Sequence, residues 1–410
     1  MSAHSLRLST VEARAVPDVG TAVTVELQPL PSLFELASEW RTLEERADAS
    51  FFVSWSWIGC WIEALRGDVE LLVLRARLRG RTVGLGVLAT HLERRHRILT
   101  SRTLRLHATG RPELDILMVE CNGLLVDREF QASVSRRMFD HLLQRESGWD
   151  ELVLDGMWEA GSLPYSDKRT TVHVASHANH YVDLAAVRAA SGGYLSLLGS
   201  KTRSRIRRSL KEYEGIGELK LHCASDTAQA LAFLEGLKTY HQSYWAARGE
   251  PGAFANPFFE RFHRQLVRGA FGRGEIQLLA VDAGKRRLGY VYNFLRRGHI
   301  YNYQSGLDYH ICGKHNRPGL VAHMLAVEFN ARAGHRVYDY LAGDSEYKQA
   351  LGTAAGEMSW VTVQRDRVRF RVEWAARMLL RRARRLRQTA SRRGAGHNLT
   401  TQSQAPSLSD

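Results

Sequence analysis

The chain has 410 residues, a formal net charge of +14 and a 44% share of hydrophobic residues. This length is usual for two domains, and the apolar share is sufficient for two hydrophobic cores. The four cysteines stand singly, without the Cys-x-x-Cys or Cys/His spacing of zinc sites, so we expect reduced thiols and no bound metal. The sequence contains neither a leader with a continuous apolar core nor an apolar run long enough to span a bilayer, and we expect a cytoplasmic protein.

The positive charge is concentrated near the C-terminus. Residues 365–393 hold twelve arginines and two acidic residues, a net charge of +10, so the rest of the chain carries only +4. This distribution argues against a general polyanion-binding surface, and nucleic acid is not an expected partner. Residues 368–387 place apolar side chains at helical spacing among the arginines. This pattern is typical of an amphipathic helix that lies on an anionic membrane or packs against its own protein.

The chain is predicted to alternate helices with strands. In the first half we expect a helix over 32–47, an aromatic segment over 51–61, a three-stranded meander over 69–99, a strand over 114–120, a helix over 129–145 and a strand over 151–157. The polar stretch 164–180 is predicted to cross into the second half. There we expect helices from residue 194, a strand over 217–226, a helix over 227–248, a second meander over 274–306, a helix over 320–334 and a buried strand near residue 339.

The two meanders repeat one pattern. Each has a basic turn that contains a glycine, Gly80 or Gly284, and then a second glycine, Gly84 or Gly289, where a β-bulge is expected. The repeat indicates a duplicated domain, with a chance similarity of β-meanders as the alternative.

The loop and helix after the second meander combine the features of an anion site. Lys314, His315 and Arg317 place positive charge before a helix that begins with Pro318 and Gly319. Proline sets the helical φ, and the free amides expected at residues 319–321 favour a phosphate group. The alternative is a plain loop with a Pro-Gly helix start.

The stretch from Asp339 to Gly352 places carboxylates, a tyrosine and a lysine after a buried strand. Ligands of open α/β sheets bind at the carboxyl ends of the strands, so chemistry is expected here. Acyl transfer from a thioester needs a base and an acid, and Asp344 and Tyr347 are the predicted pair. Two alternatives remain open, because Asp344 could cap the next helix and Asp339 could pair with Lys348 or an arginine.

Several of these motifs together match a known family. Asp339, Gly343-Asp344 and Tyr347-Lys348 stand at the spacing D-x-x-x-G-D-x-x-Y-K, and Pro318-Gly319 opens the preceding helix. With these residues the chain resembles the CelD/BcsL acetyltransferases, a branch of the GNAT superfamily related to the FemABX peptidyl transferases. Tyr340 stands where the family pattern has phenylalanine. The aromatic block 51–61 and the basic helix 194–211 match as well, so the resemblance covers about residues 30–365.

The resemblance implies an α/β fold of two tandem GNAT-like domains, each with a mixed central sheet flanked by helices, followed by a basic C-terminal helix. We expect a flexible N-terminus over 1–25, an N-terminal domain over 26–163, an acyl-CoA-binding domain over 164–364, the basic helix over 365–390 and a disordered tail over 391–410. No cofactor is expected to be bound permanently, because acetyl-CoA or another acyl-CoA would be the co-substrate.

The site residues that we expect fall into three groups. The predicted catalytic residues are Asp344, Tyr347 and Lys348. The predicted acyl-CoA contacts are Gln304, Ser305, Gly306, Asn316, Arg317, Gly319 and Leu320, and a backbone amide at 304–306 would hold the oxyanion. The predicted acceptor contacts are His241, Trp245, Arg248, Tyr303 and Asp339, although aromatic residues at this spacing are more often core.

The sequence therefore predicts an N-acyltransferase that moves an acyl group such as acetyl from acyl-CoA to an amine or hydroxyl. The acceptor would be a sugar, a lipid-linked molecule or an amino acid, as in polysaccharide or envelope biosynthesis. One alternative is a FemABX-like aminoacyl transferase that uses aminoacyl-tRNA, motivated by the basic helix and tail. The other is a non-catalytic binding module on a GNAT fold. An anionic membrane surface is a further expected partner through the C-terminal helix, which would place the protein at the inner face of the membrane.

Overall fold

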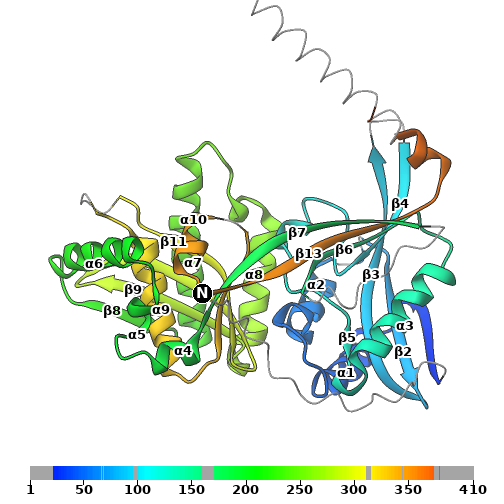
Figure 1. Ribbon diagram of the computed structural model, residues 1–410, viewed down its shortest axis with the longest axis horizontal. Helices are drawn as coiled ribbons and strands as arrows, with labels where there is room; N and C mark the ends of the chain where they lie inside the picture. The colour runs from blue at the N-terminus through cyan, green and yellow to red at the C-terminus, as the bar shows by residue number, and fades with distance from the viewer. Residues whose placement is uncertain are drawn as a thin grey trace, which may run out of the picture.

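The computed structural model describes residues 22–65, 67, 69–95, 99–158, 170–310, 315–343, 345–373 and 378. Within these residues the chain has a mixed α/β fold, in which helices cover both faces of a large central sheet (Figure 1). This confirms the predicted fold class.

The N-terminal half runs to the end of β6. Its elements are β1 (Val23–Pro29), α1 (Leu33–Glu44), α2 (Trp55–Leu65), β2 (Leu71–Leu78), β3 (Arg81–Arg95), β4 (Leu99–Leu106), β5 (Leu125–Val126), α3 (Gln131–Gln144) and β6 (Glu151–Met157). Helix α1 begins near the predicted position because the Ser32 side chain accepts the Glu35 N–H at 3.3 Å. Helices α1 and α2 pack on one face of the strands, and α3 packs on the other.

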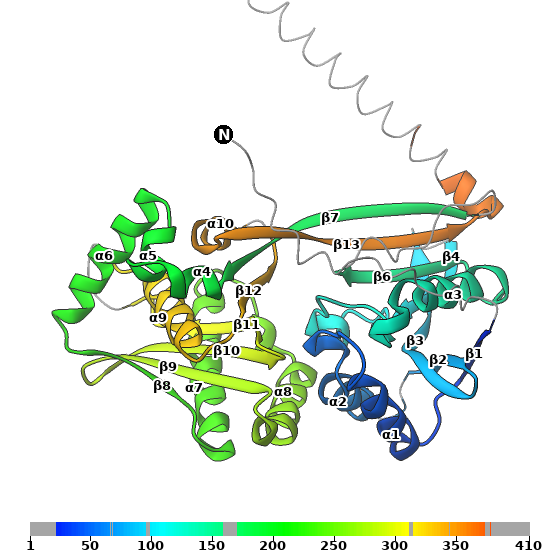
Figure 2. The same ribbon diagram turned by 60° about the horizontal axis from the view of Figure 1, so that its bottom comes forward.

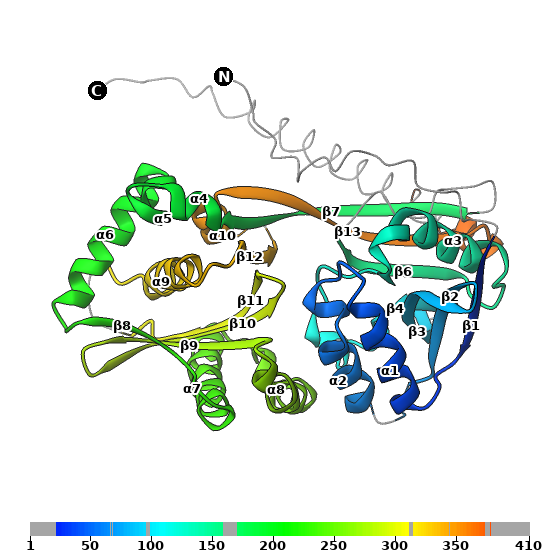
Figure 3. The same ribbon diagram turned by 90° about the horizontal axis from the view of Figure 1, so that it is seen from below.

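The C-terminal half contains the remaining elements. They are β7 (Thr170–Asp183), α4 (Leu184–Ala189), α5 (Gly193–Leu197), α6 (Ser200–Glu214), β8 (Leu219–Cys223), α7 (Thr227–Ala246), α8 (Pro257–Ala270), β9 (Ile276–Ala283), β10 (Arg286–Arg296), β11 (His299–Leu307), α9 (Pro318–Arg332), β12 (Val337–Ala342), α10 (Glu346–Leu351) and β13 (Ala354–Arg365). Figure 3 shows α9 on one side of β9 to β11, with α7 and α8 on the other.

The two halves repeat one topology. The meander β2-β3-β4 is followed by α3 and by β6, which pairs parallel with β4. In the same order, the meander β9-β10-β11 is followed by α9 and by β12, which pairs parallel with β11. Register shifts lie beside Gly84 and Gly289, as the sequence predicts. The described strands make one sheet of thirteen, with the order β1-β2-β3-β4-β6-β13-β7-β12-β11-β10-β9-β8, and β5 pairs with β3 beside this path.

Two long strands are exchanged relative to the repeated topology, because the strand that follows β6 completes the sheet beside β12 and the strand that follows β12 completes the sheet beside β6. β7 follows the last strand of the N-terminal half, yet it pairs with β12 of the C-terminal half. β13 follows β12, yet it pairs with β6 of the N-terminal half. The two exchanged strands also pair with each other, over 170–181 and 354–365, in a ribbon that runs across both halves (Figure 2). The predicted crossover segment 164–180 thus contains much of a strand that lies in the middle of the continuous sheet, between β13 and β12.

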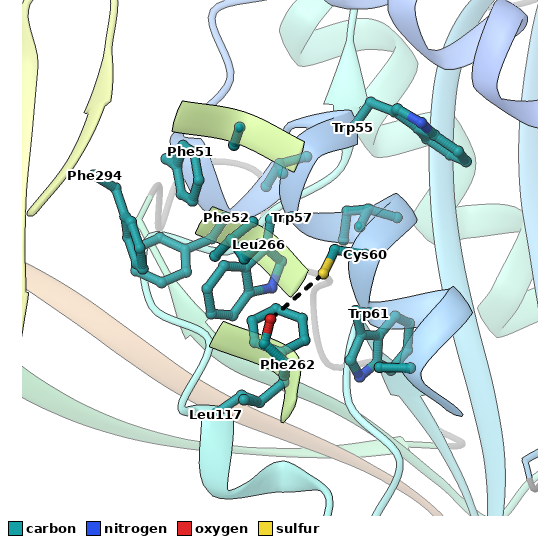
Figure 4. Packing of buried hydrophobic residues seen from close by; sticks show 14 of the residues in the cluster. Phe51, Phe52, Trp55, Trp57, Cys60, Trp61, Leu117, Phe262, Leu266 and Phe294 are labelled. Carbon is teal, nitrogen blue, oxygen red and sulfur yellow. Dashed lines mark hydrogen bonds between the residues drawn. The ribbon is translucent and has the colours of Figure 1, made fainter. Parts of the chain in front are cut away.

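The aromatic segment 51–61 forms much of the contact between the halves. Phe51 stacks on Phe294 of β10 with ring centroids 4.4 Å apart, and Trp57 packs on Phe262 of α8 at 4.9 Å (Figure 4). The Cys60 thiol lies 3.8 Å from the Phe262 carbonyl oxygen. These residues belong to one buried cluster that continues from α1 and α2 to α7 and α8. Burial of such large aromatic side chains stabilises the association of the two halves.

The predicted strand over 114–120 is wrong. Residues Asp115–Leu117 form a 3-10 turn, and Met118 has a φ of 45°. The Asp115 carboxylate accepts the N–H groups of Thr109 and Gly110, each at 2.7 Å, and this folds the chain back on itself. The apolar residues of this stretch therefore do not form a paired strand.

The C-terminal segment begins by packing against the N-terminal half. The Arg365 guanidinium lies over the Trp149 ring at 4.1 Å, and Arg367 lies 3.5 Å from the Asp150 carboxylate. The predicted disordered tail and most of the predicted basic helix lie outside the described residues. Strand β1 begins at Val23, inside the segment 1–25 that was predicted to be flexible.

Candidate functional site

The parallel strands β11 and β12 diverge towards their carboxyl ends. They pair over three residues each, His299–Tyr301 with Val337–Asp339. Beyond this point β11 continues to Leu307 along β10, and β12 continues to Ala342 along β7. Gln304, Ser305 and Gly306, which the sequence predicts as acyl-CoA contacts, lie on the diverging part of β11. The Ser305 N–H donates to the Gln304 side-chain oxygen at 3.1 Å, and Ser305 lies beyond the residues of β11 that pair with β12.

The bulge in β11 directs Tyr303 into the contact between the halves. The register with β10 passes from Gln304 to Asn302, which leaves Tyr303 as the additional residue. Its hydroxyl donates to the Leu117 carbonyl oxygen at 2.6 Å, and its ring lies 4.9 Å from the ring of His263. Tyr303 thus links the strand to the N-terminal half, and its contacts are those of a packed core residue.

The start of α9 is anchored by side chains from α6. The Ser209 hydroxyl donates to the His315 carbonyl oxygen, and the Tyr213 hydroxyl donates to the Asn316 side-chain oxygen. Asn316 also donates to the Tyr309 carbonyl oxygen at 3.1 Å. The predicted acyl-CoA contact Asn316 therefore holds the loop in place.

Arg317 and Gly319 lie at the N-terminus of the same helix. The Arg317 side chain is exposed, and the backbone carbonyl of Arg317 accepts the N–H groups of Leu320 at 3.1 Å and Val321 at 3.3 Å. The amides of residues 319–321 were predicted to be free, but those of Leu320 and Val321 thus form hydrogen bonds within the first turn of the helix. Pro318 has no N–H to offer. The Gly319 amide is the predicted anion donor that remains, together with the Arg317 side chain.

Asp339 is fully buried at the point where β11 and β12 diverge. One carboxylate oxygen accepts the Asn179 amide and the Leu341 N–H, both at 2.7 Å, and the other lies 3.1 Å from His299 Nε2. Asp339 therefore pairs with a histidine and not with Lys348 or an arginine, the partners predicted from the sequence, and its contacts join β7, β11 and β12. This is the environment of a residue that positions strands, although the sequence predicts an acceptor contact.

Lys348 and Tyr347 lie on α10, close to the end of β12. Lys348 Nζ donates to the carbonyl oxygens of Leu341 at 3.3 Å and Ala342 at 2.5 Å, and burial lowers its pKa. The Tyr347 ring is stacked parallel to that of His323 at 5.9 Å. The residue is 42% exposed, yet the protein that surrounds its hydroxyl desolvates it enough to raise its pKa to about 12. The predicted base Asp344 lies outside the described residues.

Glu120 of the N-terminal half reaches this cluster, although no motif in the sequence indicated it. The Ala342 N–H donates to its carboxylate at 2.6 Å. Burial raises the pKa of Glu120 to about 7, although the nearby Lys348 lowers it. The contact joins residues 222 positions apart, so no local pattern could indicate it.

The predicted acceptor contacts at the end of α7 are grouped around two neighbouring tyrosines. Trp245 donates its ring N–H to His241 at 3.0 Å, and the Arg248 guanidinium lies 3.5 Å from the centre of the Tyr244 ring. The Tyr244 ring lies 4.9 Å from that of Tyr309, which follows β11 and precedes α9. This group thus lies beside the start of α9.

The corresponding place in the N-terminal half is closed by a side chain. β4 and β6 also pair over only three residues each. Asn122 donates to the Leu106 carbonyl oxygen at 3.1 Å and to the Asp155 carbonyl oxygen at 3.0 Å, and so bridges the two strands. Its side-chain oxygen lies 2.8 Å from His107 Nδ1. A ligand between these strands would have to displace the Asn122 side chain and break these three hydrogen bonds.

Two other kinds of site were sought in the part of the chain that the structure describes. Three or more His, Cys, Asp or Glu side chains nowhere come together there in a way that could hold a metal ion. None of its helices combines the length and the apolar character needed to cross a membrane.

Residues 200–349 match the family model of the acetyltransferase (GNAT) domain. The matched segment begins with α6 and ends within α10, so it contains the diverging strands, the start of α9 and Lys348. No curated protein matches the chain with significance.

Solved structures with a similar course of the chain are distant in sequence. FemX is 10% identical, with a TM-score of 0.47 over 82% of this chain and 96% of that one. L-PGS from Bacillus licheniformis is 10% identical, with a TM-score of 0.49 over 84% and 95%. A tandem GNAT protein from the clavulanic acid biosynthesis pathway is 14% identical, with a TM-score of 0.40 over 82% and 98%. Similarity at this level carries no information on activity.

Proposed function

We propose that the protein is an acyltransferase that takes an acyl group from acyl-CoA and binds this donor in the C-terminal half. The observation that carries the proposal is the difference between the two halves. Asn122 bridges the diverging strands of the N-terminal half. The diverging ends of β11 and β12 have separate partners instead, the Gln304 side chain and Glu120. The match of residues 200–349 to the GNAT domain supports the same assignment.

The donor would lie with its pyrophosphate at the start of α9 and its thioester between the diverging strands. Arg317 and the Gly319 amide supply positive potential for the pyrophosphate. The Ser305 amide, once released by the Gln304 side chain, would donate to the thioester oxygen as negative charge develops on it. Tyr347 would protonate the departing thiolate, and a carboxylate would accept the proton of the attacking group.

The acceptor is proposed to be an amine or hydroxyl on a sugar, a lipid-linked molecule or an amino acid. Trp245, Arg248 and Tyr347 are exposed beside the start of α9 and offer it aromatic faces and a positive charge. Aromatic side chains of this kind suit ring-shaped or cationic acceptors.

Calorimetry with acetyl-CoA tests donor binding. At low salt, wild-type protein should bind acetyl-CoA or a longer acyl-CoA, and added salt should weaken binding because phosphate contacts are screened. Arg317→Glu should raise the dissociation constant about tenfold or more, since it places a like charge beside the pyrophosphate. Arg332→Glu, at the opposite end of the same helix, is the matched control and should have little effect. Absence of heat with every CoA thioester would refute the donor site.

Turnover tests the predicted acid and base separately from binding. Tyr347→Phe should lower kcat while the affinity for acyl-CoA stays nearly constant, because proton transfer and not donor binding is lost. Asp344→Asn distinguishes the two roles predicted for Asp344, since it should lower kcat in the same way only if Asp344 is the base. Unchanged turnover of Asp344→Asn would leave Asp344 with the capping role that the sequence also allows.

A second candidate, aminoacyl transfer from aminoacyl-tRNA, is favoured by the basic face of α6. Among the described residues, no acidic side chain lies within 4 Å of the cationic groups of this helix, which are Lys201, Arg203, Arg205, Arg207, Arg208 and Lys211. Several of them line a surface hollow along one face of the helix, opposite the buried Ile206. Filter binding of charged tRNA, with Arg207→Glu/Arg208→Glu as the variant, tests this function. Binding of neither CoA thioester nor tRNA would leave the non-catalytic binding module.

A further inference from the structure

The segment that carries Glu120 is held in a costly backbone conformation. Met118 and Cys121, on either side of it, have φ values of 45° and 48°. Non-glycine residues rarely adopt such values outside tight turns, and they persist only where the surrounding structure fixes them. Gly156 of β6 contributes to this, because its missing side chain leaves room for the Val119 carbonyl, which a Cβ atom would approach to 2.6 Å.

The backbone is also strained next to Ala342, the hydrogen-bond partner of Glu120. Leu341 has a φ of 62°, and the next residue, Ala342, donates its N–H to the Glu120 carboxylate at 2.6 Å. The carbonyl of Ala342 accepts Lys348 Nζ at 2.5 Å. A carboxylate from one half and an ammonium group from the other thus bind the same residue at the end of β12. Glu120 is only partly buried, so it remains accessible from outside.

We propose that Glu120 is the general base of the transfer reaction, supplied by the N-terminal half to the donor site of the C-terminal half. This inference rests on the proposed acyl transfer and names the carboxylate that accepts the proton. The N-terminal half would then take part in the chemistry, although Asn122 bridges its own diverging strands β4 and β6.

In the acyl transfer, one bond forms, one bond breaks and two protons move. The acceptor nitrogen or oxygen attacks the thioester carbonyl carbon and forms the new C–N or C–O bond, and its proton passes to the Glu120 carboxylate. The C–S bond breaks, and the CoA thiolate takes a proton from the Tyr347 hydroxyl. Glu120 loses its proton to solvent, and Tyr347 regains one from solvent. Both side chains are accessible enough for this exchange.

The charges around Glu120 suit a base that works near neutral pH. Burial favours the protonated form of Glu120, as does the Asp339 carboxylate to a smaller extent, whereas the Ala342 N–H and Lys348 favour the ionised form. Burial outweighs the lysine and raises the pKa of Glu120 to about 7. A general base is most effective when its pKa lies near the working pH. The other titratable groups that its charge affects are those of Cys121, Tyr303 and Tyr347.

The kinetic test is thiol release from acetyl-CoA, with water and with glucosamine as probe acceptors, measured from pH 5 to 9. Wild-type kcat/KM should rise with pH through a midpoint near 7, and Glu120→Gln should lower it about 100-fold or more at pH 8 and abolish this rise. Asp155→Asn is the matched control. It removes another partly buried carboxylate of the N-terminal half whose pKa is raised by burial, and it should keep the wild-type profile. A Glu120→Gln profile like that of wild type would overturn the proposal, as would loss of the rise in Asp344→Asn alone.

A second measurement does not depend on turnover. The carboxyl carbon of Glu120, labelled with ¹³C and assigned by its loss in Glu120→Gln, should titrate with a midpoint near pH 7 in wild type. The midpoint should move upward in Lys348→Met, because the neighbouring positive charge is removed. A midpoint below pH 5 would overturn the assignment of Glu120 as a base. Failure to bind any CoA thioester would count against the donor site instead, while melting curves and bound acetyl-CoA show whether each variant is folded.

Discussion

Replacing Gly306 by alanine should separate α7 from β11 where the thioester is proposed to lie. An alanine Cβ at this position would lie 2.1 Å from the Leu237 carbonyl oxygen and 2.9 Å from Leu237 Cα. Ordinary contact begins at 3.4 Å, so α7 would have to move by more than about 1 Å. The obstacle is helix backbone, and Leu237 itself is fully buried, so no side-chain rotation can relieve the clash.

The expected cost follows from overpacking, at about 3 kcal/mol. Alanine also lowers the conformational entropy of the unfolded chain, which stabilises the folded state by about 0.4–1 kcal/mol. The net destabilisation is therefore about 2–3 kcal/mol. For a chain of this size, an unfolding entropy of about 2.1 cal/mol/K per residue converts this to a fall in Tm of about 3 °C. Acetyl-CoA binding should weaken at the same time, because Ser305 and Gly306 shift together.

Differential scanning calorimetry measures the effect, and Gly269→Ala is the matched control. Gly269 lies in α8, and a Cβ there meets no atom within 4 Å, so alanine should stabilise the helix by about 0.5–1 kcal/mol. A Tm for Gly306→Ala equal to that of wild type, or above it, would refute the close packing of α7 on β11.

Three further outcomes are expected. The pKa of Glu120 is raised from 4.5 to about 7 in the folded chain, so the stabilisation that its protonated form provides is present below pH 4.5 and lost as pH rises through 7. Glu120→Gln should therefore exceed wild type in stability by about 3 kcal/mol at pH 8.5 but not at pH 4, as urea titrations at both pH values would reveal. Asn122→Ala should cost roughly 2–4 kcal/mol in urea unfolding, because it leaves the carbonyls of Leu106 and Asp155 without a donor, and a loss below 0.5 kcal/mol would contradict the bridging role. In co-sedimentation, the full-length protein should bind anionic vesicles more strongly than neutral vesicles, and more strongly than a chain that ends at Val363 does. Equal, weak binding of both chains would mean that the terminal arginines pack against the protein or face solvent.

The sequence predicted the elements whose patterns are local. The meanders were predicted from their repeated strand-turn-strand pattern and from the turn glycines Gly80 and Gly284. Both β-bulges lie next to the glycines at which they were predicted. Helix α9 was predicted from the Pro318-Gly319 pair at its start and from the glycine that follows its end, Gly334. Such features depend on neighbours within a few positions, which is the range that propensity and periodicity describe.

The features that escaped the sequence depend on distant partners or on one side chain. The turn at 115–117 follows from a single carboxylate, Asp115, that accepts two backbone groups. Glu120 was hidden inside a stretch predicted to be a strand, and its partner Ala342 lies in the other half. The pairing of Asp339 with His299 joins two strands that only the fold brings together. Tyr347 and Lys348, by contrast, were found from a motif, and the structure places both near the end of β12.

The exchange of β7 and β13 bears on the order in which the chain can fold during synthesis. One edge of β6 pairs with β4, but the other waits for β13, whose residues are made about two hundred positions later. At the pace of translation this leaves an unpaired edge for roughly 10–40 s. Unpaired edges invite association with other chains, so a nascent N-terminal half would need protection for that time. The segment 200–349, expressed alone, would lack both exchanged strands and would carry the same liability at β12 permanently.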